Sequence, residues 1–301
     1  MSPINIPSYW EELAEGIHQV KGAVVVVGAS DTGKTTLACY LAEQLLRRRN
    51  VVSIVSADMG QCTFGPPATI SMTILESISR FTEDVSVHSM YFIGSTSPVG
   101  HFLQTVVGVK KLVDRSLRNG AEVVIIDTTG LVYGGAAWEL KFHKIQLTDA
   151  GFIVALQRER ELEDILLPHE RRIGRRLYRL PVSEHAKVRS PEQRREHRRQ
   201  RYKNYFRNAQ AKSLSLRDVH LISPYCSAMQ GGNSSSFSRV LVGLNDDENF
   251  TVALGIVEEV DLTRDTIRLI TPLEALGDVR LIRLGSVKIG EDWNDSRINL
   301  T

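Results

Sequence analysis

Cysteine is scarce in this chain of 301 residues. Only Cys39, Cys62 and Cys226 are present, and they lie far apart without a C-x-x-C pair. Such a set provides neither the framework of a disulfide-stabilised secreted domain nor the ligand spacing of a zinc site. The sequence therefore predicts a protein of a reducing compartment, and we expect it in the cytoplasm.

Long apolar runs and a secretion signal are missing as well. No apolar stretch approaches the ~20 residues that a helix needs to cross a bilayer. Residues 1–7, MSPINIP, lack the basic and apolar regions of a signal peptide. With 42% hydrophobic and 24% charged residues, the composition is that of a globular protein, and we expect no membrane contact.

A strong net charge is the third absence. The formal net charge is only +2, which by itself indicates no class of partner. The length allows one large domain or two, and we find no internal repeats. The motifs and the places where charges cluster are therefore the features that indicate function.

The most informative motif lies at residues 24–36, VVVVGASDTGKTT. It matches the phosphate-loop pattern G-x-x-x-x-G-K-[ST]. An apolar run before it and a helix-forming segment after it favour a nucleotide site over an ordinary glycine turn. Glycines let successive N–H groups point at phosphate oxygens, and the helix N-terminus favours an anion. The residues expected to bind the nucleotide are Gly28, Ala29, Ser30, Asp31, Thr32, Gly33, Lys34, Thr35 and Thr36.

Two apolar strands each end in an acid. Residues 51–57 lead to Asp58, and residues 122–126 lead to Asp127. Ligands gather at the carboxyl ends of parallel strands, so both acids are candidates for the nucleotide site. Asp127 is expected to hold Mg²⁺ together with the Thr35 hydroxyl. Asp58 is a metal ligand, a general base or an acid that caps a turn.

Apolar runs alternate with helical segments as far as residue 156. This order predicts an α/β fold with a doubly wound, mostly parallel sheet of the P-loop NTPase type. After residue 211, short strand-like runs separated by turns predict a small β-rich domain. We expect a P-loop domain over residues 1–212 and the β-rich domain over residues 213–301.

Arginines cluster between residues 158 and 207. Among them, Arg194, Arg198 and Arg201 have the spacing of one helix face. A solvated helix held by salt bridges is the usual interpretation of a charge run. Positive charge in a chain with a phosphate site also fits a lid over transferring phosphates, or a basic surface for a polynucleotide backbone.

As an ordered set, these stretches resemble the polynucleotide 5′-hydroxyl kinase family, which includes the RNA kinases of pre-mRNA cleavage and of ribosomal RNA processing. The matching segments are 28–36, 58–61 (DMGQ), 94–98 (GSTSP), 127–130 (DTTG), 188–206, 242–246, 255–257 and 271–272. The phosphate loop alone is generic, whereas the D-x-G-Q element and the arginine-rich segment are specific. The resemblance implies a kinase with a helical lid at about residues 185–207, in the short form of the archaeal and bacterial relatives.

The resemblance implies roles for residues on the donor side. Lys34 and Thr35 would hold the ATP phosphates and Mg²⁺. Asp58 would be the general base that takes the proton from the 5′-hydroxyl. Arg189 and Arg194 match the two lid arginines that neutralise the transferring phosphoryl group.

On the acceptor side, Gln61 would help to order the metal or phosphate region. Thr128 and Gly130 match a T-x-G-W clasp that grips the terminal nucleotide. The clasp tryptophan is Leu131 here, so an aromatic surface for base stacking is missing. Trp138 lies nearby, but on a predicted helix it is more typical of the core.

The resulting prediction is an ATP-dependent polynucleotide 5′-hydroxyl kinase that phosphorylates RNA or DNA 5′-OH ends with Mg²⁺, in RNA processing or repair. One alternative is a nucleotide-switch ATPase or GTPase of the MinD or metal-chaperone kind, although no N/T-K-x-D element for guanine is found. The other is an ATP-binding, non-catalytic scaffold of RNA processing, against which Lys34, Thr35 and Asp58 argue. The sequence indicates neither an oligomeric state nor a choice between RNA and DNA.

Overall fold

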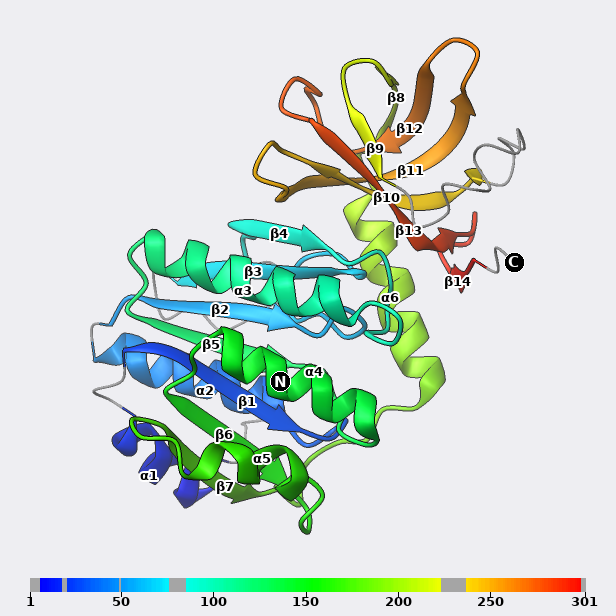
Figure 1. Cartoon of the computed structure of the whole chain (residues 1–301). Coiled ribbons are helices and arrows are strands. Elements are labelled where there is room, and N and C mark those ends of the chain that lie inside the picture. Colours follow the sequence, from blue (N-terminus) through cyan, green and yellow to red (C-terminus); the bar gives the residue numbers. More distant parts are fainter. Residues whose placement is uncertain (1–5, 18–20, 49, 76–84, 223–236, 299–301) are drawn as a thin grey trace.

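A computed structural model of the chain describes residues 6–17, 21–48, 50–75, 85–222 and 237–298 (Figure 1). The helices are α1 (Ser8–Gly16), α2 (Lys34–Arg47), α3 (Phe102–Arg118), α4 (Gly135–Leu147), α5 (Glu163–Glu170) and α6 (Pro191–Tyr205). The strands are β1 (Gly22–Gly28), β2 (Val52–Ala57), β3 (Thr69–Leu75), β4 (Ser89–Phe92), β5 (Val123–Thr128), β6 (Phe152–Gln157), β7 (Arg176–Pro181), β8 (Gln210–Ser215), β9 (His220–Ile222), β10 (Val240–Asn245), β11 (Thr251–Asp261), β12 (Thr266–Thr271), β13 (Leu281–Ile289) and β14 (Asp295–Arg297). Within these ranges, no helix combines the length and the apolar character that a bilayer crossing requires.

Five parallel strands form the centre of the sheet, in the order β2-β5-β1-β6-β7. β3 and β4 extend it antiparallel beyond β2. The phosphate loop follows β1, so it lies between the ends of two neighbouring parallel strands. The predicted mostly parallel P-loop sheet is thus confirmed.

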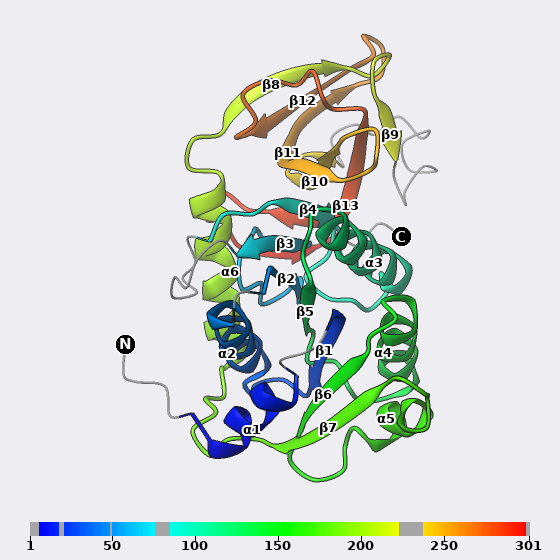
Figure 2. The same cartoon turned by 90° about the vertical axis from the view of Figure 1, so that its left-hand side faces the viewer.

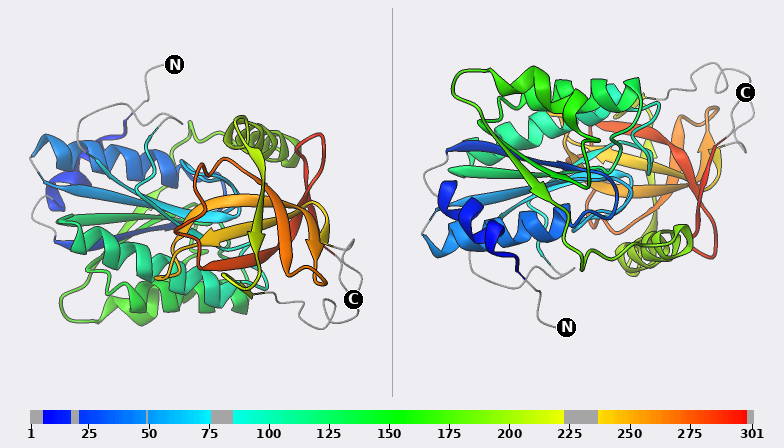
Figure 3. Two further views of the ribbon diagram at one scale, coloured as in Figure 1. Left: turned by 90° about the horizontal axis from the view of Figure 1, so that it is seen from above. Right: turned by 90° about the horizontal axis from the view of Figure 1, so that it is seen from below.

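Both faces of this sheet are covered by helices, as the two views of Figure 3 show. Successive β1 valines point to opposite faces. Val24 and Val26 pack with α1 and α2, whereas Val25 and Val27 belong to the core beneath α3, α4 and α5. A strand that is buried on both sides needs an unbroken apolar run, which is what residues 24–27 provide.

Five strands were not predicted, namely β3 and β7 in the P-loop part and β8, β13 and β14 in the C-terminal part. β3 follows the loop at residues 65–67, and β7 lies inside the arginine-rich segment. β7 is the edge strand, paired only with β6 in the part of the chain that the structure describes. Both arginines of its sequence RLYRLP are exposed, because an edge strand can turn arginines to water. The charge content of this segment therefore concealed a strand.

The C-terminal strands form a curved, mostly antiparallel continuation of the same sheet, which β11 joins by pairing with β4 at Thr251 and Met90 (Figure 2). The predicted boundary at residue 212 falls inside β8. All pairing of β8, from Gln210 to Ser215, is with β12 of the C-terminal strands. We therefore propose that the C-terminal domain begins at about residue 210, directly after α6.

The two parts of the chain meet through a close backbone contact. Gly94, with φ +80°, lies against Gly285 of β13, and the Ser286 N–H donates to the Gly94 carbonyl at 2.7 Å. A Cβ atom added to Gly285 would lie 2.9 Å from both the Gly94 and the Leu241 carbonyl oxygens. The contact leaves no room for a side chain, so glycine is required on both sides.

Two fully buried lysines lie on the sheet-facing side of α4. The Lys141 ammonium donates to the Thr128 hydroxyl at 2.8 Å and to the Thr129 carbonyl at 2.5 Å. The Lys144 ammonium has no hydrogen-bond partner among the described residues. Burial lowers the pKa of Lys144 to about 8, because the charged form loses its hydration.

We expect Gly285→Ala to destabilise the protein by about 1–3 kcal/mol, because the added methyl group must displace backbone atoms. Gly135→Ala is the matched control, since a Cβ there meets no atom within 4 Å at the start of a helix. Urea denaturation should show a lower midpoint for Gly285→Ala only. Equal midpoints for the two variants would contradict the close contact.

We expect Lys144→Met to stabilise the protein by about 1–3 kcal/mol at pH 7, because it removes a buried ammonium that has no partner. Lys141→Met is the matched control and should destabilise, since it leaves the Thr129 carbonyl unpaired.

The pKa of Lys144 is lower in the folded than in the unfolded chain, so the unfolded chain binds more protons between about pH 8 and pH 10.5. The wild-type protein therefore becomes more stable as the pH rises through this range. Melting temperatures of wild type and Lys144→Met should differ less at pH 10 than at pH 7. The same difference in melting temperature at both pH values, or a Lys144→Met variant that is less stable than wild type at pH 7, would contradict a buried positive charge on Lys144.

Candidate active site

The phosphate loop has the backbone shape that its glycines predict. Gly33, at φ +85°, forms the N-cap of α2, and Asp31 adopts the left-handed region at φ 58°. A Cβ on Gly28 would lie 2.8 Å from the Leu156 carbonyl oxygen of β6. The Thr32 hydroxyl donates to the Ala29 carbonyl at 2.9 Å and holds the loop in this turn.

The loop lysine is folded back over the loop. The Lys34 ammonium is buried and donates to the Ala29 carbonyl at 2.6 Å. Burial lowers the pKa of Lys34, and the nearby carboxylates of Asp127, Asp58 and Asp31 oppose that shift. The ammonium thus lies within the field of three acids, which offset part of the cost of burying its charge.

Asp127 lies beneath the start of α2. Its Oδ2 atom accepts from the Thr35 hydroxyl at 2.6 Å and from the Thr63 hydroxyl at 3.3 Å. The carboxyl is 2% exposed, and burial raises its pKa, against the effect of the Thr35 bond and the Lys34 charge. A buried carboxylate is costly unless it is paired, so a cation beside it would be stabilising.

The oxygen donors of this site fit Mg²⁺. Thr35 is exposed and Asp127 lies directly behind it, and both supply hard oxygen ligands. In the described part of the chain, no three His, Cys, Asp or Glu side chains cluster as a metal cage. Mg²⁺ suits such a sparse set, because it usually keeps several waters and binds substrate phosphates.

Asp58 follows β2 and caps a tight turn. Its Oδ1 atom accepts from the Gly60 N–H at 3.0 Å and from the Gln61 N–H at 2.9 Å. The side chain remains half-exposed, and no bond to Oδ2 is formed within the described residues. The turn-capping interpretation is therefore correct for one oxygen, and the other is open to a substrate.

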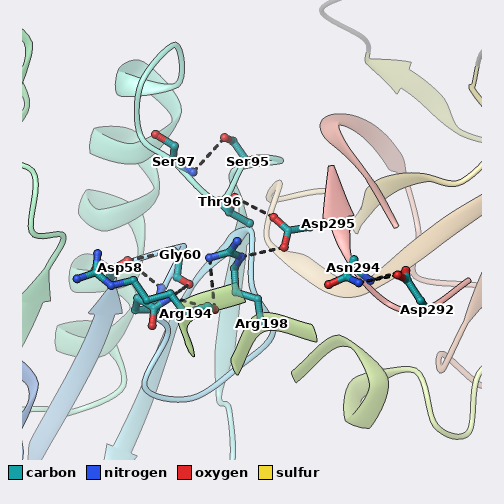
Figure 4. Close-up of polar contacts among 11 residues, drawn as sticks. Asp58, Gly60, Ser95, Thr96, Ser97, Arg194, Arg198, Asp292, Asn294 and Asp295 are labelled. Atoms are coloured by element: carbon teal, nitrogen blue, oxygen red, sulfur yellow. Dashed lines mark hydrogen bonds and ion pairs between the residues drawn. The ribbon is translucent and has the colours of Figure 1, made fainter. Parts of the chain in front are cut away.

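The predicted lid segment, residues 185–207, contacts the phosphate loop through Arg194. Arg194 of α6 forms an ion pair with the Asp31 carboxylate, and the Gln61 amide donates to the Arg194 carbonyl at 3.5 Å. Figure 4 shows Arg194 beside Asp58 and Gly60. The second predicted lid arginine, Arg189, is exposed and precedes the N-cap of α6, Ser190.

The two predicted clasp residues serve the protein's own packing. The Thr128 side chain is fully buried, donates to the Val26 carbonyl at 2.8 Å and accepts from Lys141. A direct grip on a nucleotide by this hydroxyl is not supported. A Cβ on Gly130 would lie 2.7 Å from the Ser30 N and Cα atoms, so Gly130 holds this loop against the phosphate loop.

The aromatic residue next to the clasp packs against the core. Trp138 stacks on Phe142 with a centroid distance of 4.7 Å, and its indole N–H donates to the Asp164 carbonyl at 3.0 Å. Leu131 is half-buried. Trp138 is partly buried and packs against the core, in line with the core interpretation.

Three residues of the site were missed. Thr63 contacts Asp127, Arg158 donates to the Asp31 carbonyl at 3.3 Å, and Asp295 pairs with Arg198. Arg158 follows the carboxyl end of β6, a position that could have indicated it. Thr63 and Asp295 carry no local signal, because each is brought in by a loop or a distant strand.

Comparisons with known proteins identify the family of this chain. A family model described as "mRNA cleavage and polyadenylation factor CLP1 P-loop" matches residues 28–208. A protein of Pyrococcus abyssi named polyribonucleotide 5′-hydroxyl-kinase is 34% identical over 90% of this chain and 89% of its own length. A protein of the same name from Methanocaldococcus jannaschii is 31% identical over 90% and 88%.

A solved structure has a similar fold. Clp1p in a complex with Pcf11p superposes with a TM-score of 0.72, covering 93% of this chain and 79% of that one, at 16% identity. The family match spans the phosphate loop, both strand-end acids and α6, and the archaeal relatives cover nearly the whole chain. The chain therefore belongs to the family of the mRNA cleavage and polyadenylation factor CLP1 P-loop.

Proposed function

We propose that this protein is an ATP-dependent polynucleotide 5′-hydroxyl kinase that transfers the γ-phosphate of ATP to the 5′-OH of RNA. The observation that carries the proposal is the convergence of three elements on one place. The phosphate loop contributes Lys34, the end of β2 contributes Asp58, and the lid helix contributes Arg194. The names of the archaeal relatives support a polyribonucleotide as the acceptor.

The chemistry requires positioning and charge neutralisation more than covalent catalysis. The 5′ oxygen forms a bond to the γ-phosphorus, the bond between this phosphorus and the β–γ bridging oxygen breaks, and ADP leaves. The proton of the 5′-hydroxyl passes to the open Oδ2 of Asp58. Lys34 and Arg194 would hold the charge on the phosphoryl oxygens.

Thr35 and Asp127 would hold Mg²⁺ beside the phosphates. When bound, this ion supplies charge neutralisation and orients the phosphate oxygens. The protein's own contribution is the hydrogen bond from Thr35 to Asp127, which holds these two oxygen atoms 2.6 Å apart. Asp58 is a further candidate ligand for Mg²⁺. Its carboxylate and that of Asp127 both act on the Lys34 ammonium, so both acids lie near the phosphate loop.

The direct test incubates the protein with γ-labelled ATP, Mg²⁺ and 5′-OH oligonucleotides of RNA and of DNA. Label on the RNA 5′ end supports the proposal, and label on the DNA would extend it to DNA. ATP hydrolysis without label on either polymer would favour a nucleotide-switch ATPase. Neither hydrolysis nor transfer, with ATP bound, would favour a scaffold.

We expect Asp58→Asn to lower kcat by about 100-fold or more, because the amide cannot accept the proton. The Asn oxygen still caps the turn, so ATP binding should persist. Asp261→Asn is the matched control, since Asp261 caps an exposed turn with the same pattern of acceptance from residues two and three positions on. Single-turnover transfer and ATP titration measure both quantities. Normal transfer by Asp58→Asn would refute its role as the base.

We expect Arg194→Ala to lower kcat by about 100-fold or more and to change the KM for ATP by only a few-fold, because the charge it covers develops in the transition state. The neighbouring exposed Arg195 provides the control, and Arg195→Ala should be nearly neutral. Steady-state kinetics on both variants give the comparison. An unchanged kcat would mean that Arg194 only forms a surface salt bridge and has no role in phosphoryl transfer.

A further inference from the structure

The C-terminal hairpin reaches back to the active site. β13 and β14 pair antiparallel, and β14 begins at Asp295, next to α6. Figure 4 shows the Asp295 carboxylate between Arg198 of the lid helix and Thr96 of the loop after β4. This carboxylate belongs to the C-terminal domain, whereas both of its partners belong to the P-loop domain.

Each carboxylate oxygen of Asp295 has its own partner. Oδ1 accepts from the Arg198 Nε at 2.9 Å, and Oδ2 accepts from the Thr96 hydroxyl at 3.4 Å. The side chains of Arg198 and Asp295 are only 17% and 9% exposed. An ion pair with so little exposure is weakly screened by salt, and loss of one partner leaves a buried charge unpaired.

The hydrogen bond between Asp295 and Arg198 connects Asp295 to the lid arginine, Arg194. Arg198 also donates to the Arg194 carbonyl at 3.4 Å, one helical turn earlier, and the same carbonyl accepts from Gln61. The C-terminal half of α6 is held separately, since Tyr202 and Phe206 pack against Leu254 and other C-terminal core residues. Asp295 therefore fixes the half of α6 that carries Arg194.

The hydrogen bond between Asp295 and Thr96 connects Asp295 to the turn of the proposed base, Asp58. The loop that bears Thr96 packs on the turn after β2, where a Cβ on Gly60 would lie 2.6 Å from the Thr96 carbonyl oxygen. The Gly60 N–H in turn donates to Asp58. A shift of the Thr96 loop would therefore press on the turn that orients Asp58.

We propose that Asp295 is a positioning residue of the phosphotransfer site, which sets the distance between the lid helix and the turn of Asp58. The inference rests on the proposed kinase function. Asp295 touches no reacting atom and acts through Arg198 and Thr96. The C-terminal domain thus takes part in assembling the active site.

The test compares Asp295→Ala and Asp295→Asn with Asp292→Asn. Asp292 lies in the same hairpin, exposed, and accepts only from Asn294 within the described residues. Asp295→Ala should lower kcat for RNA phosphorylation by about 10- to 100-fold with little change in the KM for ATP, because small misplacements of catalytic groups are costly. Asp295→Asn should lose less, since its oxygen can still accept from one partner, and Asp292→Asn should match wild type.

A double-mutant cycle with Arg198→Ala identifies the route of the effect. If Asp295 acts through Arg198, Asp295→Ala should add little to the loss already caused by Arg198→Ala. Faster amide hydrogen exchange in residues 191–198 of Asp295→Ala, with melting temperatures checked for each variant, gives a readout that does not depend on activity. A wild-type kcat of Asp295→Ala would overturn the inference, as would unchanged exchange in residues 191–198 or multiplicative losses in the double variant.

The two proposals fail in different ways. If wild-type protein places no label on RNA, the kinase function is wrong, whatever the variants do. If wild type transfers label and Asp295→Ala transfers it equally fast, the kinase function stands and the positioning role of Asp295 is wrong.

Discussion

The active site is organised around a buried carboxylate. Asp127 lies at the end of the central strand β5 with 2% of its surface exposed, so its charge requires partners. Thr35 and Thr63 supply hydrogen bonds, and Lys34 supplies a positive charge. These partners come from the start of α2 and from the loop after β2. The need to compensate one buried charge therefore brings the phosphate loop and the Asp58 turn to the same edge of the sheet.

Close backbone contacts then fix the remaining parts. Gly130 lies against Ser30, Gly60 against the Thr96 carbonyl, and Gly94 against Gly285. Each contact joins a loop to a segment distant in sequence and excludes a side chain. The first two link loops of the P-loop domain, and the third links that domain to β13. Together with the ion pair of Arg198 and Asp295, they make the C-terminal strands part of the frame that carries the site.

The sequence predicted the central fold because its signals are local. Four consecutive valines before a glycine-bracketed loop indicate a strand buried on both faces and a phosphate site. The edge strand β7 escaped detection, because an edge position tolerates the arginines that otherwise indicate a surface helix. The domain boundary was placed inside β8, since an exposed edge strand lacks a clear apolar pattern.

For the site, motif spacing placed Lys34, Asp127 and Asp58 together, and Arg194 lies over the phosphate loop as the resemblance implied. Thr128 is a residue for which the role implied by the resemblance does not fit the structure. The motif position is filled, but the hydroxyl points into the protein, toward Val26 and Lys141. Asp295 could not have been predicted, because its role depends on a contact across 97 positions of sequence. The catalytic roles of these residues stay predictions.

In the proposed mechanism, the group that attacks the γ-phosphate is an acceptor hydroxyl and not water. The most direct measurement is the rate of ATP consumption with one RNA oligonucleotide in two forms, 5′-OH and 5′-phosphate. We predict that ATP is consumed in step with 5′-OH ends and that consumption stops when these ends are used up or replaced by phosphate. Equal ATP consumption with both forms, or without RNA, would contradict the account.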